Sequence, residues 1–545
     1  MDKQLVQNHY DSKESYNKKV ILSSHEEYKN FIKFALPKKL RRKRARKWLE
    51  NNIEKILPVY CIDFAPIWGL LISLYSNDKR GKPPYDPQIL LRSLLFMVSF
   101  QETSITKWVE ELSCNEELLI LCGIHSKRVP GVATHYDFLQ RLENGAYQPK
   151  CQHHVPEALR RKSSSYLRAP RHKPDKEEEK SRVPDHRVVE DFVQETISHE
   201  AEPRLKNLQT LLNTILFDVA VSPSSKAGFL TNLNGMTVLG DGSVIPSACN
   251  YNGKTTCECR KLGNFKCDHD RFISDLSAEW GWDNRHKCLI FGYRFFQLVS
   301  GDNKHDLPVY LSIAPANKHE VLMAISAIDD MDKMLHESNT DYHLSRASFD
   351  ALFDMNSFYK YLIHKKIFRY AIPYRIEPAA CLELGADRSK FSADGIPLCP
   401  GGLPMRYHFK DGQGRRVYSC PVKRLARCHG KKVYLCHEKE CPQGRICQPG
   451  SPIGPLIHVS ADIDPRIHPY VARCSSEYKE LRNLRSSCER SNSMKKYTYN
   501  MSHVRTRVMP YAFIRLLLMS ILEHYKVFSQ KILERPFSNP MELLV

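Results

Sequence analysis

Three acidic residues stand where a metal-dependent reaction would need them. Asp241 and Asp350 each end a predicted strand, and Glu489 lies on a predicted helix. Three carboxylates that converge on one point repel one another unless cations lie between them, and hard oxygen ligands of this kind suit Mg²⁺ or Mn²⁺. Two such ions, about 3.5 to 4 Å apart, can activate a water or a hydroxyl on one side of a phosphate and stabilise the leaving oxygen on the other. The acids therefore predict phosphoryl chemistry with two Mg²⁺ or Mn²⁺ ions.

Strands and helices that alternate along the chain are expected to position these acids. Runs rich in β-branched and aromatic residues, separated by turn signals, predict strands over 288–301, 306–316, 342–350 and 367–374. The run MTVLGDGSVIP (236–246) predicts an earlier, short strand that ends on Asp241 and a glycine turn. Apolar residues at three- and four-residue spacing predict helices over 189–213, 319–337, 354–365, 475–496 and 511–528. The resulting order is that of an RNase H-like fold, in which the first and fourth strands are neighbours. Asp241 would then end the first strand, Asp350 the fourth, and Glu489 would bring the third carboxylate across on a helix.

The charge of the chain indicates its partner. The 81 Lys and Arg exceed the 61 Asp and Glu, and the formal net charge of +20 favours a polyanion. Eight of the twelve residues in PKKLRRKRARKW (37–48) are basic. The candidate contacts to DNA phosphates in this run are Arg41, Arg42, Lys43 and Arg44. The alternative interpretation is a solvated helix face without a partner.

A membrane is not an expected partner. No apolar run approaches the roughly 20 residues that span a bilayer. The first twenty residues are polar and lack the apolar core of a secretory signal. We therefore expect a cytoplasmic protein, associated with the nucleoid when it is bound to DNA.

Composition and pattern together predict several structural units. Hydrophobic residues make up 42% and charged residues 26% of the 545 residues, which excludes a wholly disordered or fibrous chain. We expect an α/β protein with an RNase H-like mixed sheet and flanking helices, an N-terminal all-helical domain and a Cys-rich insertion. The predicted units are a flexible N-terminus (1–26), a helical DNA-binding domain (27–149), a flexible linker (150–188), a catalytic domain in two parts (189–376 and 471–530), the insertion (377–470) and a C-terminal tail (531–545).

Cysteines form two groups with the ligand types of zinc sites. In an unexported chain the 18 cysteines would stay reduced, so clusters favour metal binding over disulfides. A structural Zn²⁺ could replace the core that the polar insertion lacks, and free thiols in a loosely ordered insertion are the alternative. The candidates in the insertion are Cys399, Cys420, Cys428, Cys436, Cys441 and Cys447. The second group, at unusual spacing, is Cys257, Cys259, Cys267 and His269.

Several stretches of the sequence resemble the bacterial insertion-sequence DDE transposases. They are LGDGSVIP around Asp241, SFDALFD around Asp350, and the R-x3-E-x6-K spacing of Arg485, Glu489 and Lys496, with SDLSAEWGWD (274–283), ANKHE (316–320) and PPYDPQILLRSLL (83–95) in support. The resemblance covers most of residues 80–525. In that family the last motif extends to a Tyr three residues before the Arg, where this chain has Arg482. This departure concerns the subfamily and the hairpin route of excision more than the metal chemistry.

The resemblance implies roles for individual residues. Asp241, Asp350 and Glu489 would bind the metal ions, and Arg485 and Lys496 would contact phosphates near the scissile bond. Arg485 and Glu489 are four residues apart and Lys496 follows seven residues later, so all three share one face of a continuous helix.

Two neighbouring residues leave alternatives open. Asp354 is the rival of Asp350 as a metal ligand, and we expect it to cap the following helix instead. His319 would either assist at the site or cap and pack at the start of its helix.

These expectations define an active transposase and two alternatives. The transposase would bind the terminal inverted repeats of its element and a target DNA, cut and join them, and act as a homodimer or larger assembly because two ends must be brought together. One alternative is an inactive DNA-binding protein derived from a transposase. The other is a nuclease of the same fold that hydrolyses DNA without joining it.

Overall fold

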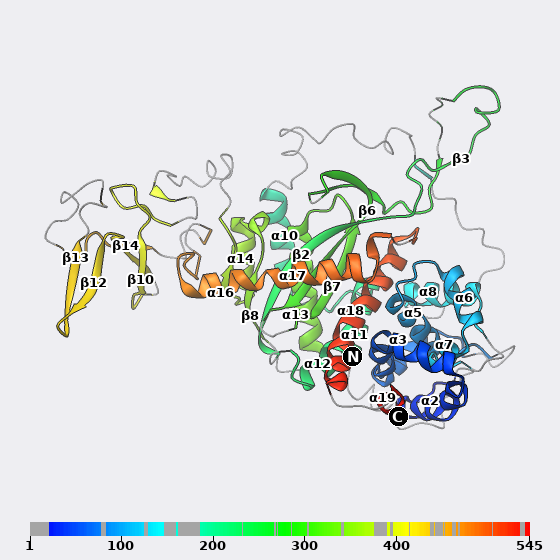
Figure 1. Cartoon of the computed structure of the whole chain (residues 1–545). Helices are drawn as coiled ribbons and strands as arrows, with labels where there is room; N and C mark the ends of the chain where they lie inside the picture. Colours follow the sequence, from blue (N-terminus) through cyan, green and yellow to red (C-terminus); the bar gives the residue numbers. More distant parts are fainter. Residues whose placement is uncertain are drawn as a thin grey trace.

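The computed structural model describes most of the chain and has an α/β fold, with one mixed sheet among many helices (Figure 1). The described residues are 21–77, 83–124, 129–145, 160–161, 186–230, 233–265, 267, 269, 271–284, 286–301, 305–338, 343–374, 390–392, 396–413, 415–436, 441, 451, 453–459, 465–466, 469–503, 505–534 and 540–544. Most of the predicted flexible N-terminus and of the predicted linker 150–188 therefore lies outside the described residues.

The N-terminal part is helical, as its apolar spacing predicts. Helix α5 lies at its centre, with almost every residue buried, and Asp86 caps its first turn by accepting from the Gln88 amide. The basic run lies at the junction of α2 and α3. The helices are α2 (His25–Leu40), α3 (Lys43–Tyr60), α4 (Trp68–Ser73), α5 (Pro87–Ser99), α6 (Ile105–Cys114), α7 (Glu116–Leu121) and α8 (Val132–Asn144).

The central sheet consists of six strands in the order β5–β6–β2–β8–β9, and β7 also pairs with β6. Strand β6 runs antiparallel to β2, β5 and β7, whereas β8 is parallel to both β2 and β9. The strands are β2 (Asn234–Pro246), β5 (Glu279–Asp283), β6 (Cys288–Ser300), β7 (Pro308–Pro315), β8 (His343–Ser348) and β9 (Arg369–Ala371). All five predicted strands are present, and β5 is an additional strand.

Helices cover both faces of this sheet. Helix α13 (Glu320–Glu337) packs on β2, β6 and β7, and α14 (Asn356–His364) follows β8. Helices α16 (Ser476–Leu484) and α17 (Ser486–Ser493) cross the sheet, and α17 contacts β2 and β6 (Figure 1). Helices α10 (His186–Ser198) and α11 (Leu208–Leu216) precede the sheet, and the break between them includes the predicted break at Pro203.

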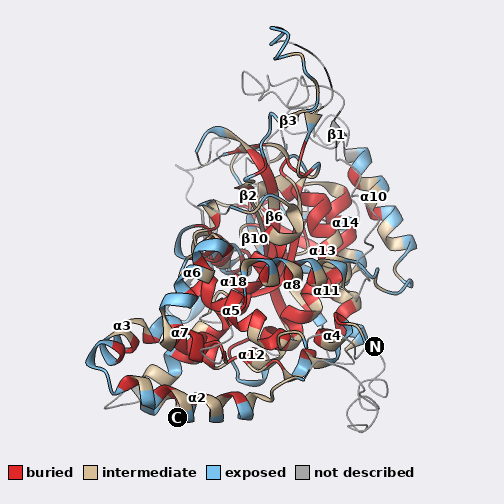
Figure 2. Ribbon diagram, turned by 90° about the vertical axis from the view of Figure 1, so that its right-hand side faces the viewer, coloured by how far each residue is buried: buried red, intermediate tan, exposed pale blue. Residues whose placement is uncertain are grey.

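Helix α18 (Met509–Leu533) joins the helical part to the sheet. It packs on α3 and α5 on one side and on α11 and β7 on the other. One apolar cluster therefore runs through both parts, and Figure 2 shows buried residues continuing from α5 and α18 into the sheet. The short helix α19 (Pro540–Leu544) lies against α3, where the Tyr60 hydroxyl donates to the Leu544 carbonyl.

Buried His524 on α18 provides a pH-dependent contribution to stability. Its imidazole lies within hydrogen-bonding distance of the Ser224 hydroxyl (2.7 Å) and the Pro308 carbonyl (2.8 Å), and burial lowers its pKa to about 4. Unfolding returns the pKa to about 6.5. Between these values the unfolded state binds the extra proton, so the free energy of unfolding rises as the pH rises from about 4 to about 6.5, by about 3 kcal/mol for this residue.

This contribution can be measured by urea unfolding between pH 4 and pH 7. A His524→Asn variant is expected to lose one proton's worth of the pH slope across this window, whereas His503→Asn, which changes an exposed histidine, should keep the parent slope. Equal slopes in the two variants would contradict the assignment to His524.

The insertion has its own small core and extends away from the main sheet (Figure 1). Strands β10 (Arg406–Lys410), β11 (Arg416–Ser419) and β14 (Ile457–Val459) form one sheet, and β12 (Lys423–Cys428) pairs with β13 (Lys431–Cys436). Cys399 packs with Met405, Tyr418 and Val459 in a small apolar cluster. The described part of the insertion is therefore a packed structure and not a loosely ordered segment.

Two predicted elements differ from the structure. The predicted helix 475–496 is interrupted at Arg485, between α16 and α17, and leaves α-helical geometry at Met494, where a π-helical segment, Met494–Thr498, begins. Strand β2 does not end at Asp241, because its antiparallel partner β6 is long enough to pair with it as far as Pro246. The glycine after Asp241 is a strand residue and not a turn.

Among the described residues, no single helix has both the length and the apolar composition to cross a membrane. Helices α3 and α4, bent by 44°, meet those two criteria only when they are taken together.

Candidate active site

Asp241 and Asp350 lie side by side because of the register of two parallel strands. The last paired residues of β2 and β8 are Leu239 and Ser348. Each aspartate lies two residues beyond this pair, Asp241 in the part of β2 that continues along β6 and Asp350 just after β8 ends. Both side chains are partly buried. The end of β8 thus leaves the two carboxylates at the same edge of the sheet.

Helix α17 is fixed over the face of β2 that carries Asp241. Leu239 packs with Val299 and Cys488, and the Cys488 thiol donates to the Leu239 carbonyl at 2.9 Å. Since side chains alternate along a strand, Asp241 points to the same face as Leu239. Asn492, one turn after Cys488, donates to Asp241 Oδ2 at 2.7 Å.

Buried polar contacts hold α17 in this position. Gln297 on β6 donates to Asn492 Oδ1 at 2.8 Å, so both groups of the Asn492 amide are used. Ser491 and Lys495 donate to opposite oxygens of Glu523 on α18, each at 2.7 Å. Lys495 and Glu523 are almost completely buried. The helix that carries Glu489 is therefore anchored to both the sheet and α18.

Glu489 lies on the exposed side of α17. Its side chain is 56% exposed and forms an ion pair with Arg485. Burial raises the pKa of Asp241, and the Arg485 guanidinium opposes this rise, so Arg485 lies close enough to act on the first carboxylate as well as the third. Arg485 therefore connects Glu489 electrostatically to Asp241.

Lys496 does not share the exposure of Glu489 that one continuous helix face would predict. Glu489 is exposed, whereas Lys496 is only 8% exposed. The physical reason is the π-helical segment that begins at Met494, since a seven-residue spacing returns to the same face only in a continuous α-helix. The continuous α-helix on which the predicted shared face depends is therefore absent, and the contact of Lys496 with DNA stays a prediction.

Glu320 is a fourth carboxylate that the sequence analysis did not identify. It is the first residue of α13, is 9% exposed, and forms an ion pair with Arg294 on β6. A Cβ added at Gly242 would lie 2.7 Å from Glu320 Cδ, so Glu320 packs against the residue that follows Asp241. The signal in the sequence is an acid in the first turn of a helix whose first residues are apolar, which is difficult to separate from ordinary capping.

The acids raise the pKa values of one another. Burial is the largest effect on Asp241, and with the negative charges of Glu320 and Asp350 it raises the pKa of Asp241 to about 7. Burial, followed by Asp350, also raises the pKa of Glu320, while Arg294 opposes the shift. A cation would relieve this repulsion, so the donor set fits a hard divalent ion.

The structure shows different contacts for the three residues Asp350, Asp354 and His319. Asp350 caps the short turn that follows β8 by accepting from the Leu352 amide at 2.8 Å. Asp354 does not cap α14, because its carboxylate is buried against Arg466, Arg473 and Tyr359. His319 caps α13, with Nδ1 accepting from the Val321 amide.

The carboxylates of the three predicted metal ligands, Asp241, Asp350 and Glu489, do not form a group of closely spaced ligand atoms in the structure. Within the described part of the chain, Cys257, Cys259, Cys267 and His269 are the only group of three or more Cys, His, Asp or Glu residues whose ligand atoms all lie within 4.8 Å of one another. These four residues could hold a metal ion.

The predicted zinc ligands of the insertion do not form such a group where they are described. Cys399 and Cys420 are buried, Cys428 is exposed and Cys441 is partly buried. The side chains of Cys436 and Cys447 lie outside the described residues.

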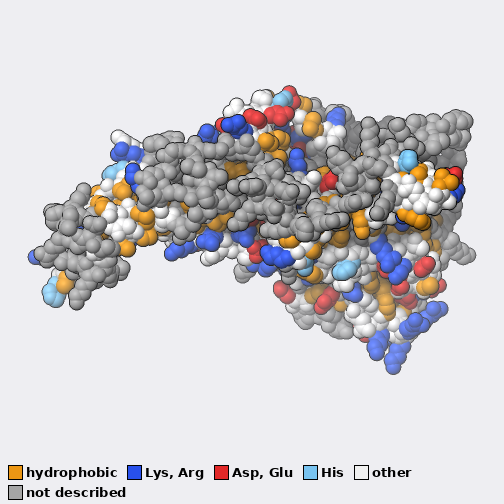
Figure 3. Space-filling model, turned by 90° about the horizontal axis from the view of Figure 1, so that it is seen from above, with side chains coloured by type: hydrophobic (Ala, Val, Ile, Leu, Met, Phe, Trp, Pro, Cys, Tyr) orange, Lys and Arg blue, Asp and Glu red, His pale blue; other side chains and the backbone are white. Residues whose placement is uncertain are grey.

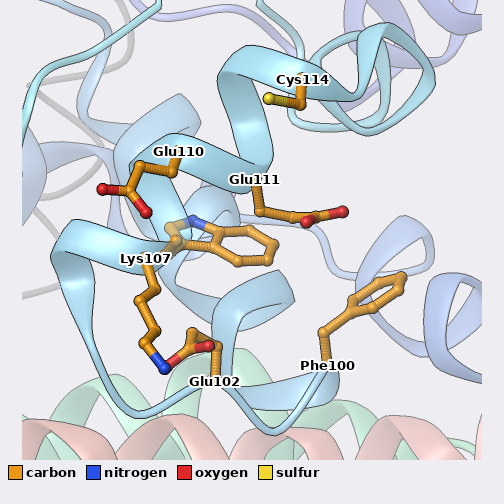
Figure 4. Close-up of a pocket in the computed structure, with 7 residues that line it drawn as sticks. Phe100, Glu102, Lys107, Glu110, Glu111 and Cys114 are labelled. Atoms are coloured by element: carbon orange, nitrogen blue, oxygen red, sulfur yellow. The ribbon is translucent and has the colours of Figure 1, made fainter.

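Arg41, Arg42, Lys43 and Arg44 are all exposed at the junction of α2 and α3. Lys and Arg side chains gather at several places on the face seen in Figure 3, including its lower right edge. A surface pocket of about 440 Å³ in the helical part is different in character, since its lining has three acids, Glu102, Glu110 and Glu111, and one base, Lys107 (Figure 4). Three carboxylates make this pocket unsuitable for a phosphate.

Comparison with known proteins supports a transposase family. Residues 45–141 match the family described as "Transposase domain (DUF772)", a range that runs from α3 to α8. No curated protein and no solved structure matches the chain.

Proposed function

We propose that the protein is a DNA transposase of the DDE type with an RNase H-like catalytic domain. The observation that carries this proposal is the placement of Asp241 and Asp350 two residues beyond the Leu239–Ser348 pair, with α17 anchored beside Asp241. The strand order supports it too, because the first predicted strand (β2) lies beside the fourth (β8). The family match of residues 45–141 independently supports a transposase.

The carboxylates would bind two Mg²⁺ or Mn²⁺ ions, with Asp241, Asp350 and Glu489 as ligands. When bound, such ions activate the attacking oxygen and stabilise the leaving oxygen of a phosphate. The protein orients the ligands. Asn492, itself held by Gln297, fixes the Asp241 carboxylate, and the Arg485 cation favours the ionised form that can bind metal.

Glu320 would influence the metal ligands through its negative charge. Its pairing with Arg294 keeps its carboxylate beside Gly242, where its charge raises the pKa of Asp241. Arg485 would contact DNA phosphates when Glu489 binds metal and no longer forms the ion pair with Arg485. Lys496 would contact phosphate only after a local change that exposes it.

The helical part would bind the terminal inverted repeats, with the exposed residues Arg41, Arg42, Lys43 and Arg44 on the DNA backbone. The target DNA would approach the carboxylate edge of the sheet. Because two ends are joined to one target, the active form would be a homodimer or a larger assembly on DNA.

The proposal can be tested with purified protein, Mg²⁺, a target plasmid, and labelled duplexes taken from the DNA on either side of the coding sequence. Joined products that disappear when the metal is chelated are the expected result. Cleavage without joining would indicate a nuclease instead, and binding without either reaction would indicate an inactive DNA-binding protein.

The contribution of the basic run can be measured separately. An Arg41→Gln/Arg44→Gln variant is expected to bind DNA more weakly and to reduce the slope of log K against log salt by about 0.9 for each phosphate that is no longer neutralised. The matched control is Lys206→Gln/Lys366→Gln, which removes the same charge from exposed positions on other elements. Equal slopes for the two variants, measured by fluorescence anisotropy over a salt series, would remove these residues from the DNA-binding surface.

A further inference from the structure

The four residues Cys257, Cys259, Cys267 and His269 lie in a projection that the proposed reaction does not use. The projection, here called the finger, comprises the described residues 250–265, 267, 269 and 271–273 between β2 and β5 and extends outward at the upper right of Figure 1. Its strands β3 (Lys254–Thr255) and β4 (Arg271–Phe272) have only two residues each and pair antiparallel. The two cysteines nearest β3 and the Cys–His pair nearest β4 therefore face each other across the finger.

The distances between these side chains match a tetrahedral metal site. Cys257 Sγ lies 3.5 Å from Cys267 Sγ, and Cys259 Sγ lies 3.4 Å from His269 Nδ1. All four ligand atoms lie within 4.8 Å of one another. A tetrahedron with Zn–S bonds of about 2.3 Å has sulfur–sulfur separations of about 3.8 Å, whereas a disulfide requires about 2.05 Å. The geometry is thus close to that of a zinc cage and far from that of a disulfide.

At the base of the finger, β4 also pairs antiparallel with the two-residue strand β1 (Arg160–Arg161), but the tip has little apolar packing. Leu262 is 82% exposed and Phe265 is 73% exposed, so the larger apolar side chains at its tip do not form a core. Its base is anchored independently, because Cys249 and Ile273 are buried in the main core. A cross-link between the two sides of the finger would stabilise this segment without being needed by the sheet.

We propose that Cys257, Cys259, Cys267 and His269 bind one Zn²⁺ ion that keeps the finger folded. Three thiolates and an imidazole favour zinc over the hard cations that carboxylates prefer. The four ligands complete the tetrahedron, which is the arrangement of a structural site and not of a catalytic one. This site is separate from the carboxylates and does not depend on the proposed transposase activity.

Metal analysis of the protein purified under reducing conditions tests the proposal. The expected result is one zinc per chain, and a Cys257→Ser/Cys267→Ser variant should contain almost none. A Cys114→Ser/Cys288→Ser variant, which changes two exposed cysteines outside both candidate groups, should retain the parent amount. The proposal is overturned if the parent remains free of zinc after reconstitution, if the first variant keeps its zinc, or if Cys257 and Cys267 are found as a disulfide.

Two further measurements keep the test decisive if the first variant misfolds. Cobalt substituted into the parent should show the ligand-field bands of a tetrahedral ion with thiolate charge transfer, and an octahedral spectrum would overturn the proposal. Chelation should speed trypsin cleavage at Lys254, Arg260 and Lys261, while the melting temperature of the main core should not change. Unchanged cleavage at these three residues would show that no metal holds the finger.

Discussion

An Asp241→Asn variant is expected to lose DNA cleavage and strand joining by at least about a thousandfold, because metal ligands that act as a unit cannot replace one another. Asp350→Asn and Glu489→Gln should give losses of the same order. DNA binding should remain, since the proposed phosphate contacts of the helical part lie on α2 and α3. The measurement is a single-turnover cleavage and joining assay beside an anisotropy titration.

The same Asp241→Asn variant should be at least as stable as the parent protein. Burial and the charges of Glu320 and Asp350 raise the pKa of Asp241 to about 7, so the ionised carboxylate is unfavourable in the metal-free fold. An asparagine carries no charge, and its side-chain oxygen can still accept the hydrogen bond from Asn492. Loss of activity with retained or higher stability is the pattern of a site in which function costs stability.

A matched control separates this effect from general damage. Asp191→Asn changes an exposed aspartate on α10 and should leave both activity and stability at the parent level. If Asp241→Asn retained cleavage, the metal-ligand role would be wrong. If it unfolded well below the parent temperature, Asp241 would have a structural role that its surroundings do not predict.

The strands and their order along the chain could be predicted from the sequence, but the end of β2 could not. Alternation and β-branched residues mark each strand of the sheet locally. Where β2 ends depends on its partner, because Cys288–Ser300 is long enough to keep it paired to Pro246. In the sequence alone, Gly240 and Gly242 suggest a turn. In the fold they make room for Phe349 and Glu320, which would clash with an added Cβ.

The acidic site was only partly predictable for a similar reason. Asp241 and Asp350 follow apolar runs, and that local signal places each near a strand end. Glu320 enters through the packing of α13 on β2, which no spacing in the sequence reports. Helical spacing correctly pairs Arg485 with Glu489, but it does not predict the burial of Lys496, because periodicity cannot reveal the π-helical segment at Met494.

Asp354→Ala is expected to destabilise the protein by about 3 to 5 kcal/mol, since it would leave buried arginines without their partner. The Asp354 carboxylate is completely buried. It accepts from Arg466 Nε at 3.0 Å and from the Tyr359 hydroxyl at 2.8 Å, and Arg473 lies 3.5 Å away. These contacts fasten the chain that returns from the insertion to α14. The loss should appear as a lower urea midpoint and a lower melting temperature.

The neighbouring aspartate provides the control for this prediction. Asp350→Ala removes the cap of one short turn and should cost only about 0.5 to 2 kcal/mol. It should nevertheless abolish cleavage, while Asp354→Ala should retain cleavage per folded molecule at a temperature where it remains folded. The two aspartates lie four residues apart in SFDALFD, yet one faces the carboxylate edge of the sheet and the other a pair of buried arginines. If Asp354→Ala unfolded no earlier than Asp350→Ala, that division of roles would be wrong.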